Sequence, residues 1–349
     1  MIDIERLDAL VGQGFLSRVL GPHGLTLFNY TPQQQFKGTW DEVTLNCRGV
    51  VLDATGAVQS RPFRKFFNLH EHANPALPDL PVEPFTVYEK LDGSLIAAST
   101  LPDGEVLLTS RGSFSSDQAQ AAATLWAQRY ADVAIPKGQT WCFELLAPWN
   151  RVVVNYGDRN DLVLLAVLDN ATGDDFALPN WPGPIVRSFD GLDDFDVIKR
   201  RLDSLPADEE GYVLRFESGL RVKAKGAEYV RLHKLLTGVT ARTIWECHAN
   251  GIGIAEIVDR VPDEFFAWVT TTSSQLLATY DEIERDAAAR HDDVVGLPTR
   301  KEQALAVAGY EHRAVVFRML DAKPYADVIW KRTRPEAERP YRPDIDGGG

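Results

Sequence analysis

Short apolar runs separated by turn residues dominate the chain between about residues 25 and 225. Runs of this length, rich in β-branched and aromatic residues, are typical of β-strands. Eight strands are predicted on this basis, at residues 49–53, 84–88, 95–100, 106–109, 141–146, 162–168, 212–216 and 220–224. Because turns join most of these runs, we expect antiparallel sheets.

Helical patterns first interrupt the strands and then replace them. Segments 117–130, rich in alanine, and 193–205 predict helices among the strands. After about residue 229 apolar residues recur at helical spacing, as at Phe265, Val269, Leu276, Tyr280 and Ile283, and again over 304–320. We therefore predict an α+β domain over residues 1–235, an all-helical domain over 236–334, and a disordered tail over 335–349, which holds three prolines and ends in three glycines.

Length and composition indicate a globular protein. The chain has 349 residues, of which 44% are apolar, so it can bury the cores of two domains. It has no apolar run long enough to span a bilayer, and the acidic residues Asp3, Glu5 and Asp8 are unlike a signal peptide. We therefore expect a cytoplasmic protein with no membrane partner. Its odd number of widely spaced cysteines predicts reduced core residues, at Cys47, Cys142 and Cys247.

The net charge of −13 argues against a protein that coats nucleic acid without discrimination. Local basic surfaces are still compatible with this charge. One candidate is Arg61, Arg64 and Lys65; a second lies near the carboxyl terminus, at Lys331, Arg332, Arg334, Arg339 and Arg342. Each cluster also fits a solvated face, and the second favours that interpretation.

Lys90 follows the apolar run 85–88 and precedes the turn signal Asp92-Gly93, which places it at a strand end. A lysine amine is a nucleophile only without its extra proton, a form that desolvation or neighbouring cations favour. Lys65, Lys223 and Lys225 could supply such cations. Taken alone, however, the segment 90–94 favours an ordinary solvent-facing lysine beside a hairpin turn.

Acidic residues stand in or beside two apolar strands. Glu144 interrupts the apolar run 141–146, and Glu210 directly precedes the run that starts at Gly211. Singly, each is compatible with a surface residue. Together with Asp92 they could organise the water shell of Mg²⁺, which contacts few protein groups directly.

Lys223 and Lys225 alternate along a predicted strand, so their side chains should lie on one face. Two lysines directed together suit a triphosphate whose charge must be offset while pyrophosphate leaves. An edge strand protected by lysine is the competing interpretation of this segment.

Taken together, the segments resemble the bacteriophage T4-type RNA ligase 1 family of the covalent nucleotidyltransferase superfamily. The element at 60–69, S-R-P-F-R-K-F-F-N-L, is similar to an element that capping enzymes and DNA ligases lack. The other matching segments are 47–51, 90–94, 110–113, 143–144 with Pro148, 150–153, 164–167, 210–213, and 222–225 with Tyr229 and Leu232. The resemblance implies an antiparallel-sheet nucleotidyltransferase (ATP-grasp-like ligase) domain with an amino-terminal RNA-ligase module, followed by a helical domain that selects RNA.

The resemblance also implies roles for individual residues. Lys90 would take AMP from ATP, while Lys223 and Lys225 would hold the α-phosphate and promote departure of pyrophosphate. The metal, Mg²⁺ or Mn²⁺, would be placed by Asp92, Glu144 and Glu210. The outer phosphates or the RNA end would be bound by Arg48 and Lys65. Further nucleotide contacts are implied for Glu89, Phe66 and Arg111, with Glu144 also near the ribose.

In this family AMP passes to an RNA 5′-phosphate and is then displaced by a 3′-hydroxyl. The implied substrate is RNA with such ends, including broken tRNA, and an end-healing kinase or phosphatase would be the partner. The chain departs from the family pattern at Arg111, which stands in an S-K-G element, and at Leu91, where a polar residue is common. The region from about Leu236 onward matches no motif.

Three alternatives remain. A DNA ligase or a capping guanylyltransferase would share the lysyl-nucleotide step, but the 60–69 element and the helical end of the chain count against both. A noncatalytic RNA-binding relative is the third, and retention of the charged residues counts against it. Trp245, Trp268 and Trp330 could stack RNA bases, although core packing explains them more simply.

Overall fold

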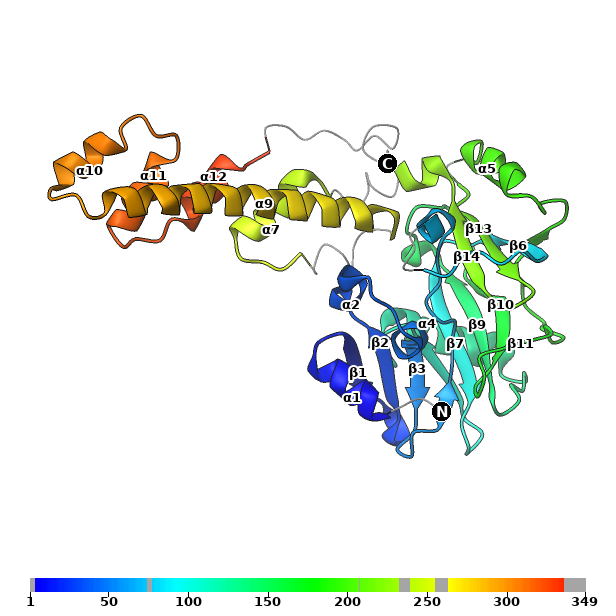
Figure 1. Ribbon diagram of the computed structural model, residues 1–349. Helices are drawn as coiled ribbons and strands as arrows, with labels where there is room; N and C mark the ends of the chain where they lie inside the picture. Colours follow the sequence, from blue (N-terminus) through cyan, green and yellow to red (C-terminus); the bar gives the residue numbers. More distant parts are fainter. Residues whose placement is uncertain (1–3, 74–76, 207, 232–238, 255–262, 336–349) are drawn as a thin grey trace. The chain divides into compact units, whose positions relative to one another are not determined.

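The computed structural model describes residues 4–73, 77–206, 208–231, 239–254 and 263–335. The chain divides into two compact units, Met1–Leu236 and Thr237–Gly349 (Figure 1). The predicted domain boundary after residue 235, the family position Leu232 and the predicted tail from residue 336 onward lie outside the described residues.

The first unit begins with a small sheet. Its strands are consecutive and antiparallel, in the order β1 (Leu16–Leu20), β2 (Thr26–Tyr30), β3 (Arg48–Leu52) and β4 (Val58–Ser60). Helix α1 (Ile4–Gly12) buries Leu7 and Leu10 against this sheet. Between β2 and β3 lie α2 (Pro32–Lys37) and α3 (Glu42–Asn46), and α3 starts with a capping box between Asp41 and Thr44.

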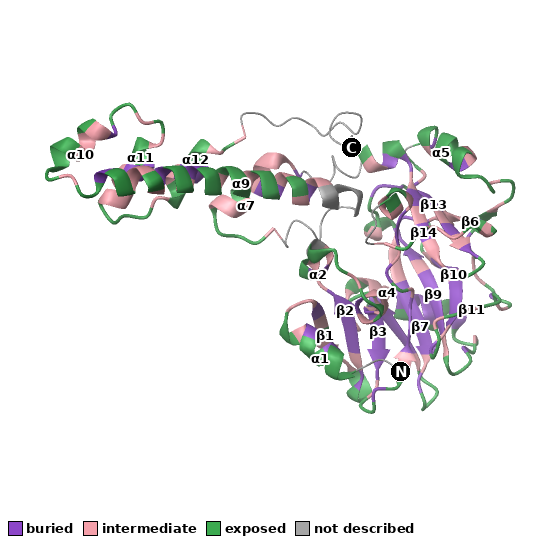
Figure 2. Ribbon diagram, viewed as in Figure 1, coloured by how far each residue is buried: buried purple, intermediate pink, exposed green. Residues whose placement is uncertain are grey.

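The second sheet carries the largest core of the unit. Its antiparallel order is β11 (Asp175–Phe176), β10 (Asp161–Asp169), β9 (Gln139–Leu146), β7 (Ser94–Thr100) and β8 (Val106–Ser110). The central strands are buried along most of their length (Figure 2). The alanine-rich helix α4 (Asp117–Leu125) continues into the short π-helix η3 (Trp126–Tyr130), and both pack on this sheet. Trp126 and Trp181 belong to the core that they form with the sheet.

The third sheet has the order β12 (Ser188–Phe189), β6 (Phe85–Lys90), β13 (Gly211–Phe216), β14 (Arg221–Lys225) and β5 (Phe67–Asn68). One face packs against Ile198 of α5 (Phe195–Asp203) through Val87, Leu214 and Val222. The strand alternation therefore places Lys90, Lys223 and Lys225 on the opposite face. Only the pair β14–β5 is parallel among the described residues.

The α+β prediction for this unit is confirmed, as are the eight predicted strands and both predicted helices, with small shifts at their ends. Sequence analysis missed the helices α1, α2 and α3, the strands β1 and β2, and the short strands β4, β5, β11 and β12. The short strands hold two or three residues each, too few to form a periodic pattern. In strand β1 only Leu16 is buried and Leu20 is exposed, so the strand lacks an apolar run or a regular alternation.

The second unit is helical throughout its described residues, as predicted. Its elements are α7 (Ala241–Ala249), α9 (Asp263–Val294), α10 (Arg300–Ala306), α11 (Arg313–Leu320) and α12 (Ala326–Arg332). The core joins Ile283 and Ala287 of α9 to Val315 of α11 and Ile329 of α12. Trp330 is also buried, and the indole of Trp245 donates to its carbonyl, so these tryptophans pack inside the unit. Among the described residues, none of the helices has the length and apolar character needed to cross a membrane.

Candidate active site

Lys90 lies in a row of residues that crosses three strands of the third sheet. Lys90 ends β6 and faces Gly211 at the start of β13, and Gly211 in turn faces Lys225 at the end of β14. Glu210 directly precedes Gly211. The register therefore brings two lysines and one acid, which are separated by up to 135 positions in the sequence, to the same end of the sheet.

Glu210 is the centre of this cluster. Its side chain is only 3% exposed, and Oε1 accepts from Lys90 Nζ at 2.7 Å and lies 3.3 Å from Lys225 Nζ. The other oxygen, Oε2, is buried and has no hydrogen-bond partner among the described residues. A buried carboxylate oxygen without a hydrogen-bond partner can bind a cation or accept a hydrogen bond from a ligand.

At two points of the site, glycines allow neighbouring backbone segments to approach each other closely. Gly211 has a φ of 142°, and a Cβ there would lie 2.1 Å from the carbonyl oxygen of Ala224. A Cβ on Gly93 would lie 2.4 Å from the carbonyl oxygen of Leu145. Both positions therefore require glycine, which explains the E-G and D-G dipeptides physically.

Glu144 is held beside the lysine cluster. Its Oε1 accepts from the backbone N–H of Gly93 at 3.0 Å. Burial raises the pKa of Glu144, the charge of Lys90 lowers it, and Glu210 raises it again, so that the pKa is about 8. The three groups are thus electrostatically linked, and the raised pKa favours the protonated form of Glu144 more than in an ordinary glutamate, whereas a bound cation would favour its charged form.

Asp92 has a different environment from the two glutamates. Its Oδ2 accepts from the backbone N–H groups of Val153 and Val154, both at 2.7 Å, and its Oδ1 accepts from the hydroxyl of Tyr229 at 2.8 Å. The Asp92 backbone N–H donates to the hydroxyl of Tyr156. Both carboxylate oxygens already accept hydrogen bonds, so Asp92 fixes the loop beside Lys90 and is less open to the predicted metal contact than Glu210.

A second cluster of cations surrounds a tyrosine that sequence analysis missed. Tyr30, at the end of β2, is 5% exposed; Lys65 Nζ lies 5.5 Å and the Arg111 guanidinium 5.4 Å from its ring centre. Burial alone would raise the pKa of Tyr30, but Lys65, Arg111 and Arg48, which also hydrogen-bonds to Tyr30, lower it to about 8. Such a lowered pKa indicates a strongly positive site suited to an anion.

Phe66 links the two clusters. The Arg48 guanidinium lies 5.8 Å and Lys223 Nζ 6.0 Å from the centre of its ring. Arg48 Nη1 is buried without a hydrogen-bond partner among the described residues. Gly49 permits this arrangement, since a Cβ there would lie 2.8 Å from the carbonyl oxygen of Arg111.

Ten of the eleven predicted site residues have side chains in, or directly beside, these two clusters; Glu89 does not. As the neighbour of Lys90 on β6, Glu89 directs its side chain to the other face of the sheet. It lies 3.6 Å from Arg187. The site residues that sequence analysis missed are Tyr30 and Tyr156; Tyr30 ends an apolar run, Leu25–Tyr30, which was the available signal.

We expect Tyr30 to ionise near pH 8, well below an ordinary tyrosine. As the pH is raised, near-ultraviolet absorbance should show one tyrosine that ionises near pH 8, and Tyr30→Phe should remove this step. Pyrophosphate should move the step to higher pH, because an anion offsets the cations that lower the pKa. Tyr325→Phe is the control, since hydrogen bonding to Glu284 and burial raise the pKa of Tyr325. A step that survives in Tyr30→Phe would contradict this assignment.

The match to a known protein family covers these clusters. A sequence model of the RNA ligase family matches residues 46–229, which is more than half of the chain. A provisionally named RNA ligase of Thermovibrio ammonificans is 34% identical over 132 residues, covering 36% of this chain and 34% of that protein. A provisionally named bifunctional polynucleotide kinase/RNA ligase of Autographa californica nuclear polyhedrosis virus is 30% identical over 246 residues, covering 61% of this chain and 34% of that protein.

The chain thus spans about a third of the length of these curated relatives. Among solved structures, an archaeal ATP-dependent RNA ligase is similar at 16% identity and a TM-score of 0.45, covering 76% of this chain and 70% of that one. A Naegleria gruberi RNA ligase mutant with ATP and manganese is similar at 15% identity and a TM-score of 0.34, covering 44% and 52%. The family match over residues 46–229 decides the assignment: the chain belongs to the T4-type RNA ligase family.

Proposed function

We propose that this chain is an ATP-dependent RNA ligase that joins 5′-phosphate and 3′-hydroxyl ends through an AMP bound to Lys90. The observation that carries the proposal is the shared contact of Lys90 and Lys225 with the buried Glu210, at 2.7 and 3.3 Å. The contact holds a candidate nucleophile beside a second cation at a strand end. Clustered lysines around one acid suit attack on a phosphate better than a structural role.

The first step forms a bond between Lys90 Nζ and the α-phosphorus of ATP, breaks the bond to the β-phosphate oxygen, and releases pyrophosphate and a proton. An oxygen of the RNA 5′-phosphate then attacks the same phosphorus and frees the lysine. Finally the 3′-hydroxyl attacks the RNA phosphorus, and AMP leaves. Lys223 and Lys225 offset the charge on the α-phosphate during the first step.

The cluster around Tyr30 is assigned to the outer phosphates of ATP. Arg48, Lys65 and Arg111 supply three positive charges there, and these charges lower the pKa of Tyr30 against the effect of burial. Phe66, which contacts both Arg48 and Lys223, connects these cations to those beside Lys90. This division assigns Arg111, for which the resemblance implied a nucleotide contact, to the outer phosphates and adds Tyr30 to the site.

The acids fit a divalent cation such as Mg²⁺ or Mn²⁺. Glu210 Oε2 is buried without a hydrogen-bond partner among the described residues, and Glu144 lies in the same electrostatic group. Carboxylate oxygens are the protein ligands that Mg²⁺ accepts. A bound cation would offset phosphate charge, and Glu210 and Glu144 would hold it, whereas the oxygens of Asp92 are already engaged.

The experiment that tests this function mixes the purified chain with ATP, Mg²⁺ and a single-stranded RNA bearing a 5′-phosphate and a 3′-hydroxyl. ATP-dependent RNA circles on a denaturing gel are the expected result. Labelling of the chain by GTP instead of ATP, or joining of DNA alone, would favour a capping enzyme or a DNA ligase and contradict the proposal.

We assign the choice or orientation of the RNA to the helical unit. We expect the reaction to serve RNA repair, with broken tRNA among its substrates. A kinase or phosphatase must then prepare the ends, and the name of the viral relative includes a polynucleotide kinase beside the RNA ligase. A chain that ends at Leu236 should keep labelling by ATP, while its joining of folded RNA should fall about tenfold or more. Equal joining of folded and unfolded RNA by both chains would contradict this assignment.

A further inference from the structure

Cations continue along β14 away from Lys90. Lys225, Lys223 and Arg221 alternate with Val222 and Ala224, which are buried in the core on the other face. The three cations therefore share one face, and four residues of strand extend over about 13 Å. Arg215 of β13 lies directly opposite Arg221 in the register. This row is longer than a triphosphate, so the phosphates of ATP cannot contact all of its cations.

Aromatic rings accompany the row. The Arg221 guanidinium lies 4.8 Å from the ring centre of Phe63, and Lys223 Nζ lies 6.0 Å from that of Phe66. The two rings meet edge to face, with centres 6.2 Å apart. Both are partly exposed. Cations beside partly exposed aromatic rings are an arrangement that can bind single-stranded nucleic acid, because phosphates pair with the cations and bases stack on the rings.

A groove of about 670 Å³ is built on this surface. Its walls include Phe63, Phe66, Arg215 and Arg221, and Arg64 lies in the same lining. The lining contains five arginine or lysine residues and four carboxylates, whereas the whole chain has a net charge of −13. One of these carboxylates, Asp175, contacts both Arg215 and Arg221, so two guanidinium groups share a single negative charge.

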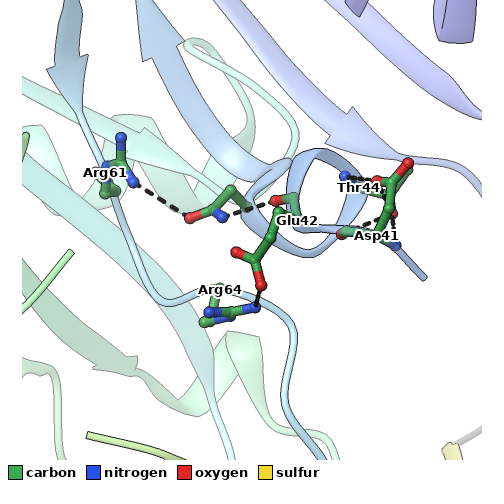
Figure 3. A network of polar contacts seen from close by, with 6 residues as sticks. Asp41, Glu42, Thr44, Arg61 and Arg64 are labelled. Atoms are coloured by element: carbon green, nitrogen blue, oxygen red, sulfur yellow. Dashed lines mark hydrogen bonds and ion pairs between the residues drawn. The ribbon is translucent and has the colours of Figure 1, made fainter. Parts of the chain in front are cut away.

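The two arginines of the 60–69 element have different environments (Figure 3). Arg61 is 8% exposed and donates to the carbonyl of Asn170 and to Asn46, so it holds the fold together. Arg64 is 49% exposed and lies 2.9 Å from Glu42, which is 77% exposed. An exposed pair of this kind contributes little stability, so Arg64 can exchange its partner for a phosphate at small cost.

We propose that this groove binds single-stranded RNA adjoining the end that reacts at Lys90. The reacting end of the RNA would lie beside Lys225 and Lys223, and the adjoining phosphates would lie along the groove from Arg221 to Arg64, with a base on Phe63. The inference rests on the proposed function, because it places the RNA substrate of that reaction. The groove begins beside Lys223, at Phe66 and Arg221, and is assigned to RNA alone, whereas Lys223 and Lys225 also act on ATP.

The test compares Arg64→Glu and Phe63→Ala with Arg18→Glu. Arg18 is the matched control, since it is 46% exposed and pairs with Asp8 elsewhere on the same unit. The probe is a fluorescent single-stranded RNA with hydroxyls at both ends, whose affinity is measured by anisotropy over a range of salt concentrations. ATP labelling of each variant is measured at saturating ATP.

Arg64→Glu should weaken RNA binding about tenfold. It should also reduce the slope of log affinity against log salt concentration by about 0.7 for each RNA phosphate that the variant no longer neutralises. Phe63→Ala should weaken binding by a similar factor, because a base can no longer stack on the ring. Arg18→Glu should bind as the parent chain does, and all three variants should be labelled by ATP.

Two results would overturn the groove assignment. One is unchanged RNA affinity in both groove variants, and the other is a loss of ATP labelling in Arg64→Glu. Failure of the parent chain to be labelled would instead overturn the proposed function.

Discussion

Lys90→Ala should abolish covalent labelling of the chain by α-labelled ATP. The change removes the only nitrogen that the proposed first step uses as a nucleophile, so no other side chain is expected to replace it. The remaining pair, Lys225 and Glu210, keeps the buried acid neutralised at 3.3 Å, so the fold should survive. Labelling is measured on a denaturing gel after incubation with Mg²⁺.

A second substrate separates loss of chemistry from loss of fold. RNA that already carries AMP on its 5′-phosphate needs no lysyl-AMP, so Lys90→Ala should still join it to a 3′-hydroxyl end. The control variant is Lys137→Ala, which removes an exposed lysine that donates to the carbonyl of Pro102 and should label normally. Labelled Lys90→Ala would remove Lys90 from the mechanism.

The sequence was most informative where chemistry depends on residues close together along the chain. The strand end at Lys90, the alternation of Lys223 and Lys225, and the acid before Gly211 were all predicted from local patterns, and the sheet register joins them into one row. Residue type was enough there because each candidate lies in or directly beside a strand whose apolar residues alternate or form a run. The fold class followed from the same strands.

The sequence was least informative about the partners of each side chain. Asp92 was predicted to help place a metal because of its position in K-L-D-G, but its oxygens are engaged by Val153, Val154 and Tyr229, which lie 61 to 137 positions away. Tyr30 was missed because its importance comes from cations on other segments. Such long-range contacts leave no local pattern, so only the structure reveals them.

Glu89 shows a simpler limit. The family resemblance implied a nucleotide contact for Glu89, yet adjacent residues in a strand face opposite sides of the sheet, so its side chain is on the other face from that of Lys90. Its side chain therefore lies 3.6 Å from Arg187 instead. Residues that are adjacent in a strand are close in sequence, but their side chains are on opposite faces of the sheet. The register of the strands therefore decides which predicted residues can act together, more than the spacing of the motif does.

Glu210→Gln should slow formation of the lysyl-AMP at least about 100-fold, the scale of losing one group that stabilises charge in a preorganised site. Glutamine has nearly the same shape and its oxygen can still accept from Lys90 and Lys225, so the change removes mainly charge. Folding stability should fall by about 1.5–3 kcal/mol, because hydrogen bonds to a charged partner are weakened. The rate is measured in a single turnover at several Mg²⁺ concentrations, and stability is measured by urea unfolding.

The two measurements distinguish a catalytic carboxylate from a structural one. If Glu210 only neutralises the lysines, Glu210→Gln should lose stability and keep its rate under conditions where it is folded. If Glu210 also places the cation, the rate should fall and should recover partly as Mg²⁺ is raised. Asp208→Asn removes an exposed charge two residues away and should change neither quantity. A folded Glu210→Gln chain with the parent rate would contradict the assignment and leave Oε2, the buried oxygen without a partner among the described residues, unexplained.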